Sequence, residues 1–376
     1  MHGATTSIRH LYVHVPFCAA KCHYCAFYSE AGSAAKMGEY VDAVLSELAT
    51  WAERLTPRTI FFGGGTPSLL PAPLMRRLLS SIHALIHSSA APEFTIECNP
   101  STVSTEKANL FREFGVNRIS MGVQALDDEL LDRLGRVHSV KAALESYRKL
   151  RAAGFDNINL DLIFGLPGQT LEHWRHTLER VIELQPEHIS TYCLILEEDT
   201  EFWRMYVSDV GAQHAVPLPD DDAQLAMYEI AIETLAAAGY RQYEISNFAK
   251  PGRECRHNIA YWEGKDYLGL GPSACSTIGD HRWQNVPDTD RFVAAIVNHQ
   301  SPIINEEHLT PETRAAERAA FGMRMNAGVP AELVRGRWDK QIAELLSAEL
   351  VQWRDGRLKP TKRGILFADA VAAEFV

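Results

Sequence analysis

Short apolar runs alternate with amphipathic stretches over the first half of the chain. Six runs rich in β-branched and aromatic side chains each predict a buried strand. They are residues 11–15, 58–62, 93–97, 117–121, 157–161 and 188–194. Strands that alternate with helices in this way form a parallel sheet with right-handed crossovers. Six units are fewer than the eight of a closed barrel, so we expect an α/β protein with an open, partial (β/α)6 barrel.

The stretches between these strands have helical periodicity. Apolar residues recur on one stripe at Tyr40, Val41, Val44, Leu45, Leu48 and Trp51, and on another at Leu171, Trp174, Leu178, Val181 and Ile182. Further helices are predicted over residues 71–88, 104–114, 126–134, 140–153 and 221–238. Residues 240–285 then combine many Gly, Trp, Tyr, His and Asn residues with little periodicity, which is typical of a structured functional loop or a partner-binding surface.

The last part of the chain carries the signals of a small separate domain. Thr310 precedes Pro311 as a helix N-cap, and Thr361 can cap a final helix. Asp355-Gly356 lies between two short alternating runs, which predicts a hairpin. Helices followed by a hairpin resemble a winged-helix module. We expect a barrel over residues 1–240, a ligand-contacting segment packed on it over 241–305, and a winged-helix-like α+β domain over 306–376.

Charge and composition narrow the class of protein. The 376 residues carry a formal net charge of -11, which argues against nucleic acid as a partner and favours a packing role for the C-terminal domain. No apolar run approaches the length of a membrane span. The first residues lack the apolar core of a signal peptide, so we expect a cytoplasmic protein.

Three of the seven cysteines lie close together, in Cys18-Ala-Ala-Lys-Cys22-His-Tyr-Cys25, directly after the first strand. In a reducing cytosol, such thiols are metal ligands or catalytic groups more often than disulfides. Three thiolates in one loop can hold three corners of a cubane iron–sulfur cluster, which leaves the fourth iron open to a small molecule. The alternatives are three incidental cysteines or a zinc site, whose fourth ligand His23 could provide only by distorting a short loop.

Polar residues and glycines follow several of the predicted strands, where β/α barrels place their chemistry. Residues 63–65 are three glycines after the second strand, which let the backbone approach a ligand closely or form a plain tight turn. Glu97 ends the third strand, and a carboxylate in an apolar barrel is costly unless a cation pairs with it. Gln124 and Asp161 end the next two strands and can bind hydroxyl groups. Arg136 can bind a carboxylate in a bidentate manner, or be a solvated arginine at a helix end.

The cysteine spacing C-x-x-x-C-x-x-C after a first strand resembles the radical S-adenosylmethionine (SAM) superfamily, whose fold is a partial barrel. Five ordered segments extend the resemblance: Tyr12-Val-His-Val-Pro-Phe-Cys18, Phe62-Gly-Gly-Gly-Thr-Pro67, Glu97-Cys-Asn-Pro100, Gly122-Val-Gln124 and Asp161-Leu-Ile-Phe-Gly-Leu-Pro-Gly-Gln169. Together they are similar to the branch that contains oxygen-independent coproporphyrinogen oxidase and the HemW haem chaperones. The resemblance covers nearly the whole chain.

This resemblance implies cofactors and ligands for them. A [4Fe–4S] cluster would be held by Cys18, Cys22 and Cys25. One SAM would be bound by Tyr12, Gly64, Glu97, Gln124, Arg136 and Asp161. The oxidase holds a second SAM beside the first, and Tyr24, Gly65 and Thr66 match its contacting positions, although that site is tied to the oxidase reaction.

The chain departs from the oxidase in three places. The oxidase pattern has a further cysteine two residues after the triplet, where this chain has Phe27. The chain begins eleven residues before Tyr12, so we expect the N-terminal element that encloses the oxidase site to be missing. His257-Asn-Ile-Ala-Tyr261-Trp262 matches a pattern of the chaperone branch.

That last pattern also suits haem on physical grounds. A neutral imidazole at His257 is a good axial ligand for haem iron, and Tyr261 and Trp262 offer flat apolar faces to a porphyrin. The alternatives are a structural histidine in an aromatic cluster, or iron ligation by Cys255 or Cys275.

The resemblance therefore implies a haem chaperone that binds a [4Fe–4S] cluster, SAM and haem. It would deliver haem to acceptor haemoproteins, including membrane haemoproteins through transient contact. The alternatives are oxygen-independent coproporphyrinogen oxidase, which decarboxylates propionate side chains by a radical route, or another porphyrin-directed radical enzyme. No catalytic residue is assigned.

Overall fold

The computed structural model describes residues 7–86, 91–207 and 216–376. Its main sheet has six parallel strands in chain order, and each pairs with the next. They are β1 (Ile8–Val15), β2 (Leu55–Gly64), β3 (Glu93–Cys98), β4 (Arg118–Gln124), β5 (Ile158–Phe164) and β6 (His188–Cys193). All six predicted strands are therefore confirmed, and the predicted α/β class with a mostly parallel, open sheet is confirmed with them.

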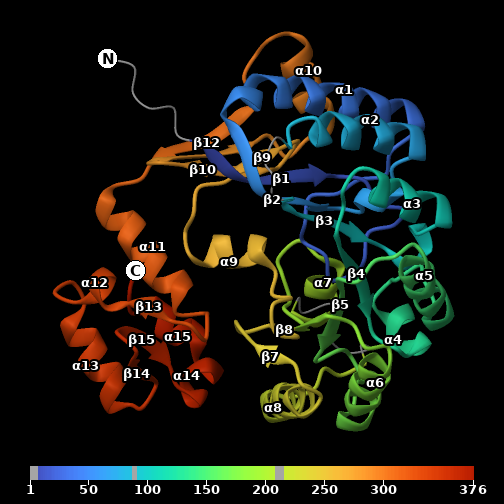
Figure 1. Ribbon diagram of the computed structural model, residues 1–376. Coiled ribbons are helices and arrows are strands. Elements are labelled where there is room, and N and C mark those ends of the chain that lie inside the picture. The colour runs from blue at the N-terminus through green and yellow to red at the C-terminus, as the bar shows by residue number, and fades with distance from the viewer. Residues whose placement is uncertain (1–6, 87–90, 208–215) are drawn as a thin grey trace, which may run out of the picture.

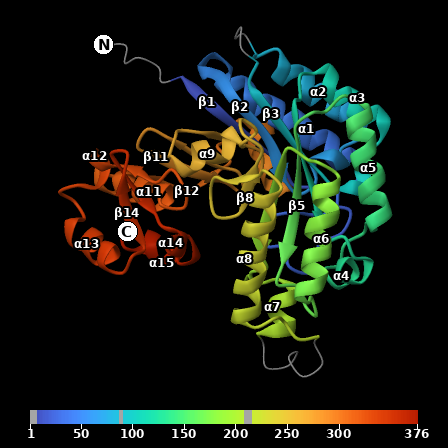
Figure 2. The ribbon, with the colours of Figure 1, turned by 60° about the horizontal axis from the view of Figure 1, so that its bottom comes forward.

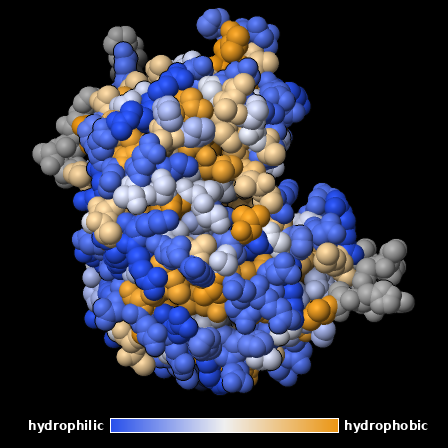
Figure 3. Space-filling view, turned by 90° about the vertical axis from the view of Figure 1, so that its right-hand side faces the viewer, coloured by the Kyte–Doolittle hydropathy of each residue, from blue (hydrophilic) through white to orange (hydrophobic). Residues whose placement is uncertain are grey.

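Helices cover the outer face of this sheet (Figures 1 and 2). They are α1 (Ala34–Trp51), α2 (Ala72–His83), α3 (Thr105–Glu113), α5 (Val140–Ala152), α6 (Leu171–Glu183) and α8 (Asp221–Ala237). The short helices α4 (Asp128–Arg133) and α7 (Glu201–Tyr206) instead share a separate, smaller hydrophobic cluster. Figure 3 shows one face of the molecule, on which hydrophilic residues predominate and hydrophobic residues form patches between them. None of the helices in the described ranges is long and apolar enough to cross a membrane.

The alternation of side chains along β1 explains how one strand serves both the core and the barrel interior. Leu11, Val13 and Val15 are fully buried in the main hydrophobic core, which also contains residues of α1. The intervening Tyr12 and His14 project from the opposite face, as the two-residue period of a strand requires. The parallel strands therefore present polar and aromatic side chains to the barrel interior.

Residues 241–285 extend the sheet at both edges, which the sequence pattern did not predict. Strand β8 (Asn247–Ala249) pairs antiparallel with β6, and β7 (Arg241–Gln242) pairs with β8. At the other edge, β9 (Leu268–Leu270) pairs parallel with β1. Strands of two or three residues are too short to show a period of two in the sequence. Helix α9 (Arg256–Trp262) connects these two edges and lies between the sheet and the C-terminal part of the chain (Figure 1).

A second, antiparallel sheet packs beside β9. It consists of β10 (Cys275–Ile278), β11 (His281–Asn285) and β12 (Ile303–His308), in that order, and α10 (Thr289–Val297) lies between the last two in the chain. Trp283 of β11 stacks on Trp51 of α1 at 5.7 Å between ring centroids, which joins this sheet to the helix layer.

The C-terminal residues have a hydrophobic core of their own. They form α11 (Pro311–Gly322), β13 (Val329–Pro330), α12 (Ala331–Val334), α13 (Asp339–Ser347), β14 (Val351–Arg354), β15 (Arg357–Pro360), α14 (Lys362–Leu366) and α15 (Ala368–Ala373). The three local predictions are confirmed. Thr310 caps α11, and Thr361 caps α14. Asp355 and Gly356, both at positive φ, form the turn between β14 and β15. The division of the chain at 240 and 305 stays a prediction.

Gly364 provides a test of the packing of the C-terminal part. A Cβ there would lie 1.8 Å from the backbone oxygen of Leu350, whereas a Cβ at the helical Gly38 would meet nothing within 4 Å. We expect Gly364→Ala to lower the free energy of unfolding by about 1–3 kcal/mol through overpacking. Gly38→Ala should raise it by up to about 1 kcal/mol, because alanine is the better helix former. Chemical denaturation of both variants measures this, and equal effects would contradict the packing described.

Candidate functional site

The three clustered cysteines lie in the loop that connects β1 to α1. This loop is tied to itself, because the backbone N–H of Cys18 donates to Glu30 at 2.9 Å and that of Glu30 donates to Pro16 at 2.7 Å. It is also tied to the turn after β2, because the N–H of Thr66 donates to the carbonyl of Phe17 at 2.8 Å. The cysteine loop and the glycine-rich turn therefore form one structural unit at the carboxyl ends of β1 and β2.

The three sulfurs are partly exposed, and none is in a disulfide. The Sγ of Cys18 lies 3.5 Å from the Oγ1 of Thr66, and the Sγ of Cys22 accepts a hydrogen bond from Arg136 at 3.4 Å. Burial raises the pKa of Cys25. The loop thus presents three thiols together, with one arginine beside them.

His23 is not placed as a fourth ligand in this loop. Its Nδ1 is 3.0 Å from the carbonyl oxygen of Arg133, and its ring packs against Phe202. Among the described residues, the three cysteine sulfurs are not all within 4.8 Å of one another. Zinc–sulfur bonds of about 2.3 Å would draw the sulfurs of a zinc site to within about 4 Å of one another. The arrangement therefore fits a cluster better than a single zinc ion.

Gly64, the last residue of β2, and Gly65 directly after it are required by close packing within the protein. Gly64 has φ of +105°, and a Cβ there would lie 2.6 Å from the ring of His14. A Cβ at Gly65 would lie 2.9 Å from the backbone of the cysteine loop. The glycines thus let the turn after β2 lie directly against that loop, and their predicted contact with a ligand stays a prediction.

Glu97, the penultimate residue of β3, forms no ion pair with any arginine, lysine or histidine of the described residues. Burial, together with the nearby carboxyl of Asp161, raises its pKa to about 8, and the N–H of Gly64 opposes this shift. Burial also raises the pKa of Tyr12, with a contribution from Glu97. A half-buried carboxyl without a cation is costly to ionise, so this position suits a ligand that carries a positive charge.

Arg136 connects the cysteine loop to the end of β4. Its Nη2 donates to the carbonyl of Gly122 at 2.8 Å, while its Nη1 reaches Cys22. Its Nε is buried and has no hydrogen-bond partner, and no carboxylate of the described residues forms an ion pair with it. Gln124 lies beside this arginine on a bulge of β4, at φ of +67°. The arginine therefore has donor capacity left for a carboxylate.

Asp161 and Tyr24 complete the group at the strand ends. The carboxyl of Asp161 accepts hydrogen bonds from Ser120 at 2.9 Å and from Asn159 at 2.8 Å, and burial raises its pKa. Burial raises the pKa of Tyr24; the charge of Arg136 acts to lower this pKa, and that of Asp161 acts to raise it. Contacts and electrostatic interactions thus link the candidate SAM residues in one region above the sheet, with Tyr24, Gly65 and Thr66 on its cysteine-loop side.

His257 lies elsewhere, in the first turn of α9 below this region. Its Nδ1 is 2.7 Å from the Oγ1 of Thr59, and its ring stacks on Phe61 at 5.1 Å. Burial lowers its pKa to about 3, with smaller contributions from His10 and Arg118, so the ring is neutral. Its Nε2 is buried and has no hydrogen-bond partner.

Glu93 holds α9 in this place, and sequence reasoning missed it. Its carboxylate accepts the backbone N–H groups of Arg256 at 2.9 Å and His257 at 3.0 Å, which caps the helix N-terminus. Cys255 donates to the same carboxylate at 3.6 Å and is buried, and Cys275 is exposed. The cap comes from a strand more than 160 positions earlier in the chain, so no local motif could reveal it.

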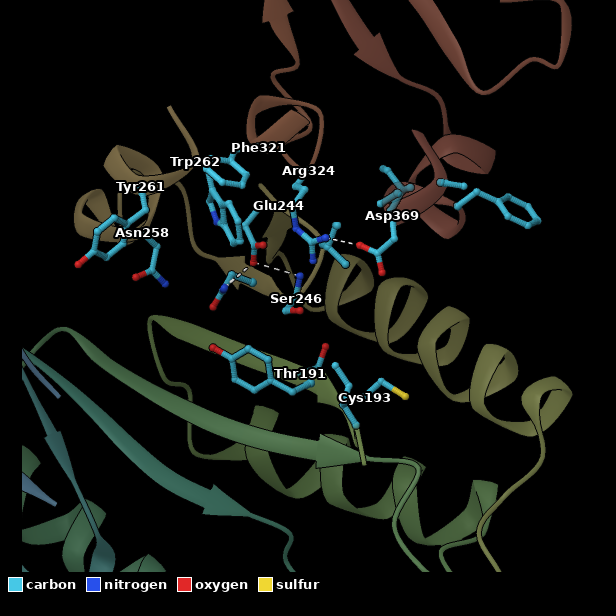
Figure 4. A pocket seen from close by; sticks show the side chains of 18 of the residues that line it. Thr191, Cys193, Glu244, Ser246, Asn258, Tyr261, Trp262, Phe321, Arg324 and Asp369 are labelled. Carbon is cyan, nitrogen blue, oxygen red and sulfur yellow. Dashed lines mark hydrogen bonds and ion pairs between the residues drawn. The ribbon is translucent and has the colours of Figure 1, made fainter. Parts of the chain in front are cut away.

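A cavity of about 1030 Å³ opens on the other side of α9, between the β6–β8 edge of the sheet and the C-terminal part of the chain. Figure 4 shows Tyr261 and Trp262 on its wall, with Thr191 and Cys193 of β6 across from them. His257 is not among the residues that line it, but it contacts the ring of Tyr261 edge-on at 4.8 Å. The three predicted haem residues are therefore divided between the barrel interior and this cavity.

The C-terminal part contributes cavity residues that sequence reasoning did not identify. The guanidinium of Arg324 lies 5.3 Å from the ring centre of Trp262 and forms an ion pair with Asp369 of α15 (Figure 4). The ring of Phe321 of α11 packs edge-on against that of Trp262, at 6.4 Å between the ring centroids. The cavity thus combines flat aromatic surfaces with an arginine.

Comparisons with known proteins give the family. Residues 12–181 match the model of the radical SAM superfamily, whose domain implies a [4Fe–4S] cluster and SAM, and residues 309–367 match that of the HemN C-terminal domain. The solved coproporphyrinogen III oxidase (HemN) from Escherichia coli superposes with a TM-score of 0.85 at 25% identity, over 99% of this chain and 91% of that one.

Other relatives are more similar to the chain in sequence. The heme chaperone HemW of Bacillus subtilis is 38% identical over 343 residues, which is 90% of this chain and 89% of the relative. The heme chaperone HemW of Lactococcus lactis is 34% identical over 97% of this chain and 96% of its own length. The chain therefore belongs to the radical SAM superfamily and, within it, to the family of the heme chaperone HemW.

Proposed function

We propose that this protein is a haem chaperone that binds a [4Fe–4S] cluster, SAM and haem and passes haem to acceptor haemoproteins in the cytoplasm or at the membrane. The observation that carries the proposal is the similarity to a relative named heme chaperone HemW over 97% of the chain. The aromatic cavity beside α9 supports it, because it offers a place of suitable chemistry for a porphyrin.

Cys18, Cys22 and Cys25 are our candidates for the cluster ligands. They lie in one loop that is anchored at both ends, and Arg136 donates to the sulfur of Cys22. When bound, the cluster provides an iron with an open position for SAM.

Glu97 and Arg136 are our candidates for the two charged ends of the SAM amino-acid group. Glu97 has no cation and Arg136 has no carboxylate among the described residues, so an ammonium and a carboxylate would satisfy both. Tyr12, Gly64, Gln124 and Asp161 lie around these two residues and would complete the pocket. A second SAM at Tyr24, Gly65 and Thr66 stays a prediction.

For haem, we assign the cavity lined by Tyr261 and Trp262. The ring faces would pack on the porphyrin, and Arg324 would bind a propionate. His257 has a neutral ring and an Nε2 without a partner, but it is buried outside this cavity, so its role as the axial ligand stays a prediction. Cys193 also lines the cavity, but burial raises the pKa of its thiol to about 11, which disfavours the thiolate.

The oxidase is the second candidate, because the solved coproporphyrinogen III oxidase superposes on nearly the whole chain. In the oxidase pattern, a fourth cysteine stands where this chain has Phe27, which is 69% exposed. An anaerobic assay for coproporphyrinogen turnover separates the two candidates, and turnover at catalytic rates would support the oxidase.

The iron and sulfide content of the protein tests the cluster ligands. Anaerobic reconstitution should give about four irons and four sulfides per chain. Replacing Cys18, Cys22 or Cys25 by Ala should abolish the cluster, because each sulfur holds one iron. Cys275→Ala, which removes an exposed cysteine outside the loop, should leave iron and sulfide content unchanged. Full iron content in a variant that lacks all three loop cysteines would refute the assignment.

The second prediction concerns SAM binding and its pH dependence. Arg136→Ala and Glu97→Gln should each weaken SAM binding by about ten-fold or more, since a charged hydrogen bond is worth roughly 1.5–3 kcal/mol, and Glu97→Gln should leave the cluster intact. With the pKa of Glu97 at about 8, its carboxyl is mostly protonated at pH 6. A cationic ligand needs the ionised form, so affinity should rise roughly twenty-fold between pH 6 and 7.5.

Equilibrium binding of SAM to cluster-loaded protein measures this pH dependence. Glu97→Gln should remove the rise, whereas Glu113→Gln, at an exposed carboxylate paired with Arg76, should retain it. A rise that persists in Glu97→Gln would show that another group is responsible.

The third prediction concerns haem. Trp262→Ala and Arg324→Ala should each weaken haem binding by about ten-fold, through loss of a stacking face and of a propionate partner. Trp353 and Arg335 form the same kind of cation–π pair at 4.6 Å outside the cavity, so Trp353→Ala and Arg335→Ala are matched controls. Haem titration followed by the Soret band measures affinity, and His257→Ala should change the band itself. Equal losses in the cavity variants and the controls would contradict the cavity assignment.

A further inference from the structure

His281, Glu306 and His308 bring three metal-ligand side chains together on the second sheet, far from the cysteine loop in sequence. His281 of β11 and His308 of β12 are direct cross-strand partners. Glu306 precedes His308 by two residues and therefore projects from the same face of β12. One nitrogen or oxygen atom of each residue lies within 4.8 Å of the other two.

The surroundings hold these side chains in place. The Nε2 of His281 lies 2.6 Å from the Oε1 of Glu306, and the rings of His281 and His308 stack at 5.0 Å with an angle of 16° between their planes. The ring of Trp283 packs against His281 at 4.7 Å. An aromatic stack on paired strands reduces the conformational freedom that the ligands would lose on binding an ion.

The site is accessible, and no arginine of the described residues forms an ion pair with its carboxylate. Glu306 and His308 are exposed, and His281 is half-buried. The neighbouring Arg282 projects from the opposite face of β11, where Glu307 and Glu317 bind it at 3.0 and 2.6 Å. Glu306 is therefore left with His281 as its partner, and an ion could reach all three donors from solvent.

We propose that His281, Glu306 and His308 bind one divalent transition-metal ion of the class of Zn²⁺. Two imidazoles and one carboxylate form a donor set that zinc accepts readily, and they leave a fourth position open for water or for a ligand from another molecule. This site is separate from the cluster and from the haem cavity, and its existence does not depend on the proposed function.

The test is a zinc titration of cluster-loaded protein under anaerobic conditions, in competition with a chromogenic chelator. One zinc ion per chain should bind with an affinity that falls at least ten-fold in His308→Ala and in Glu306→Gln. Both side chains are exposed, so these variants should fold and retain the cluster. His176→Ala, at an exposed histidine of α6, is the matched control and should bind zinc as the unaltered protein does.

X-ray absorption at the zinc edge identifies the ligands. The proposal expects nitrogen and oxygen neighbours at about 2.0–2.2 Å, whereas zinc held by cysteines would show sulfur at about 2.3 Å. A sulfur shell, the absence of stoichiometric binding, or equal affinity in His308→Ala and His176→Ala would each overturn the proposal.

Discussion

The candidate cofactor site depends on one interaction, in which Arg136 binds both the sulfur of Cys22 and the carbonyl of Gly122. This joins the cysteine loop to the end of β4 and leaves the Nε of the arginine without a partner. Glu97, on β3, is the complementary group, because it has a carboxyl with a raised pKa and no ion pair among the described residues. A half-buried carboxylate without a cation and a half-buried arginine without a carboxylate each cost free energy. A zwitterionic amino-acid group would satisfy both, which is why their arrangement supports SAM as the ligand.

The same sheet also positions the second region. Glu93 is the first residue of β3, the strand that carries Glu97 near its other end, and the carboxylate of Glu93 caps α9. The orientation of α9 places His257 against Thr59 inside the barrel and Trp262 at the cavity. The parallel strands thus fix the candidate cofactor site at their carboxyl ends and, through one helix cap, the wall of the candidate haem site. Residues of α8, α11, α14 and α15 form further parts of the cavity wall, so the porphyrin would lie between the sheet edge and the C-terminal part.

Structural features that depend on residues close together in the chain could be predicted from the sequence. The six parallel strands follow from apolar runs, and the caps at Thr310 and Thr361 follow from residues adjacent in the chain. Strands β7 to β9 are too short to have a periodic signal. The cap by Glu93 and the pairing of Arg324 with Asp369 join residues distant in sequence, and no motif marks either of them. The separation of His257 from the cavity lined by Tyr261 and Trp262 likewise arises from the direction of each side chain on a short helix, which the shared motif did not indicate.

The most direct test of the central claim is the kinetics of haem transfer. Cluster-loaded protein carrying haem would be mixed anaerobically with increasing concentrations of an apo-b-type cytochrome, and the Soret band of the acceptor would be followed over time. A chaperone predicts a transfer rate that increases with acceptor concentration and exceeds the rate of spontaneous haem dissociation, because transfer takes place within a complex of the two proteins. A rate that equals spontaneous dissociation at every acceptor concentration would contradict the account.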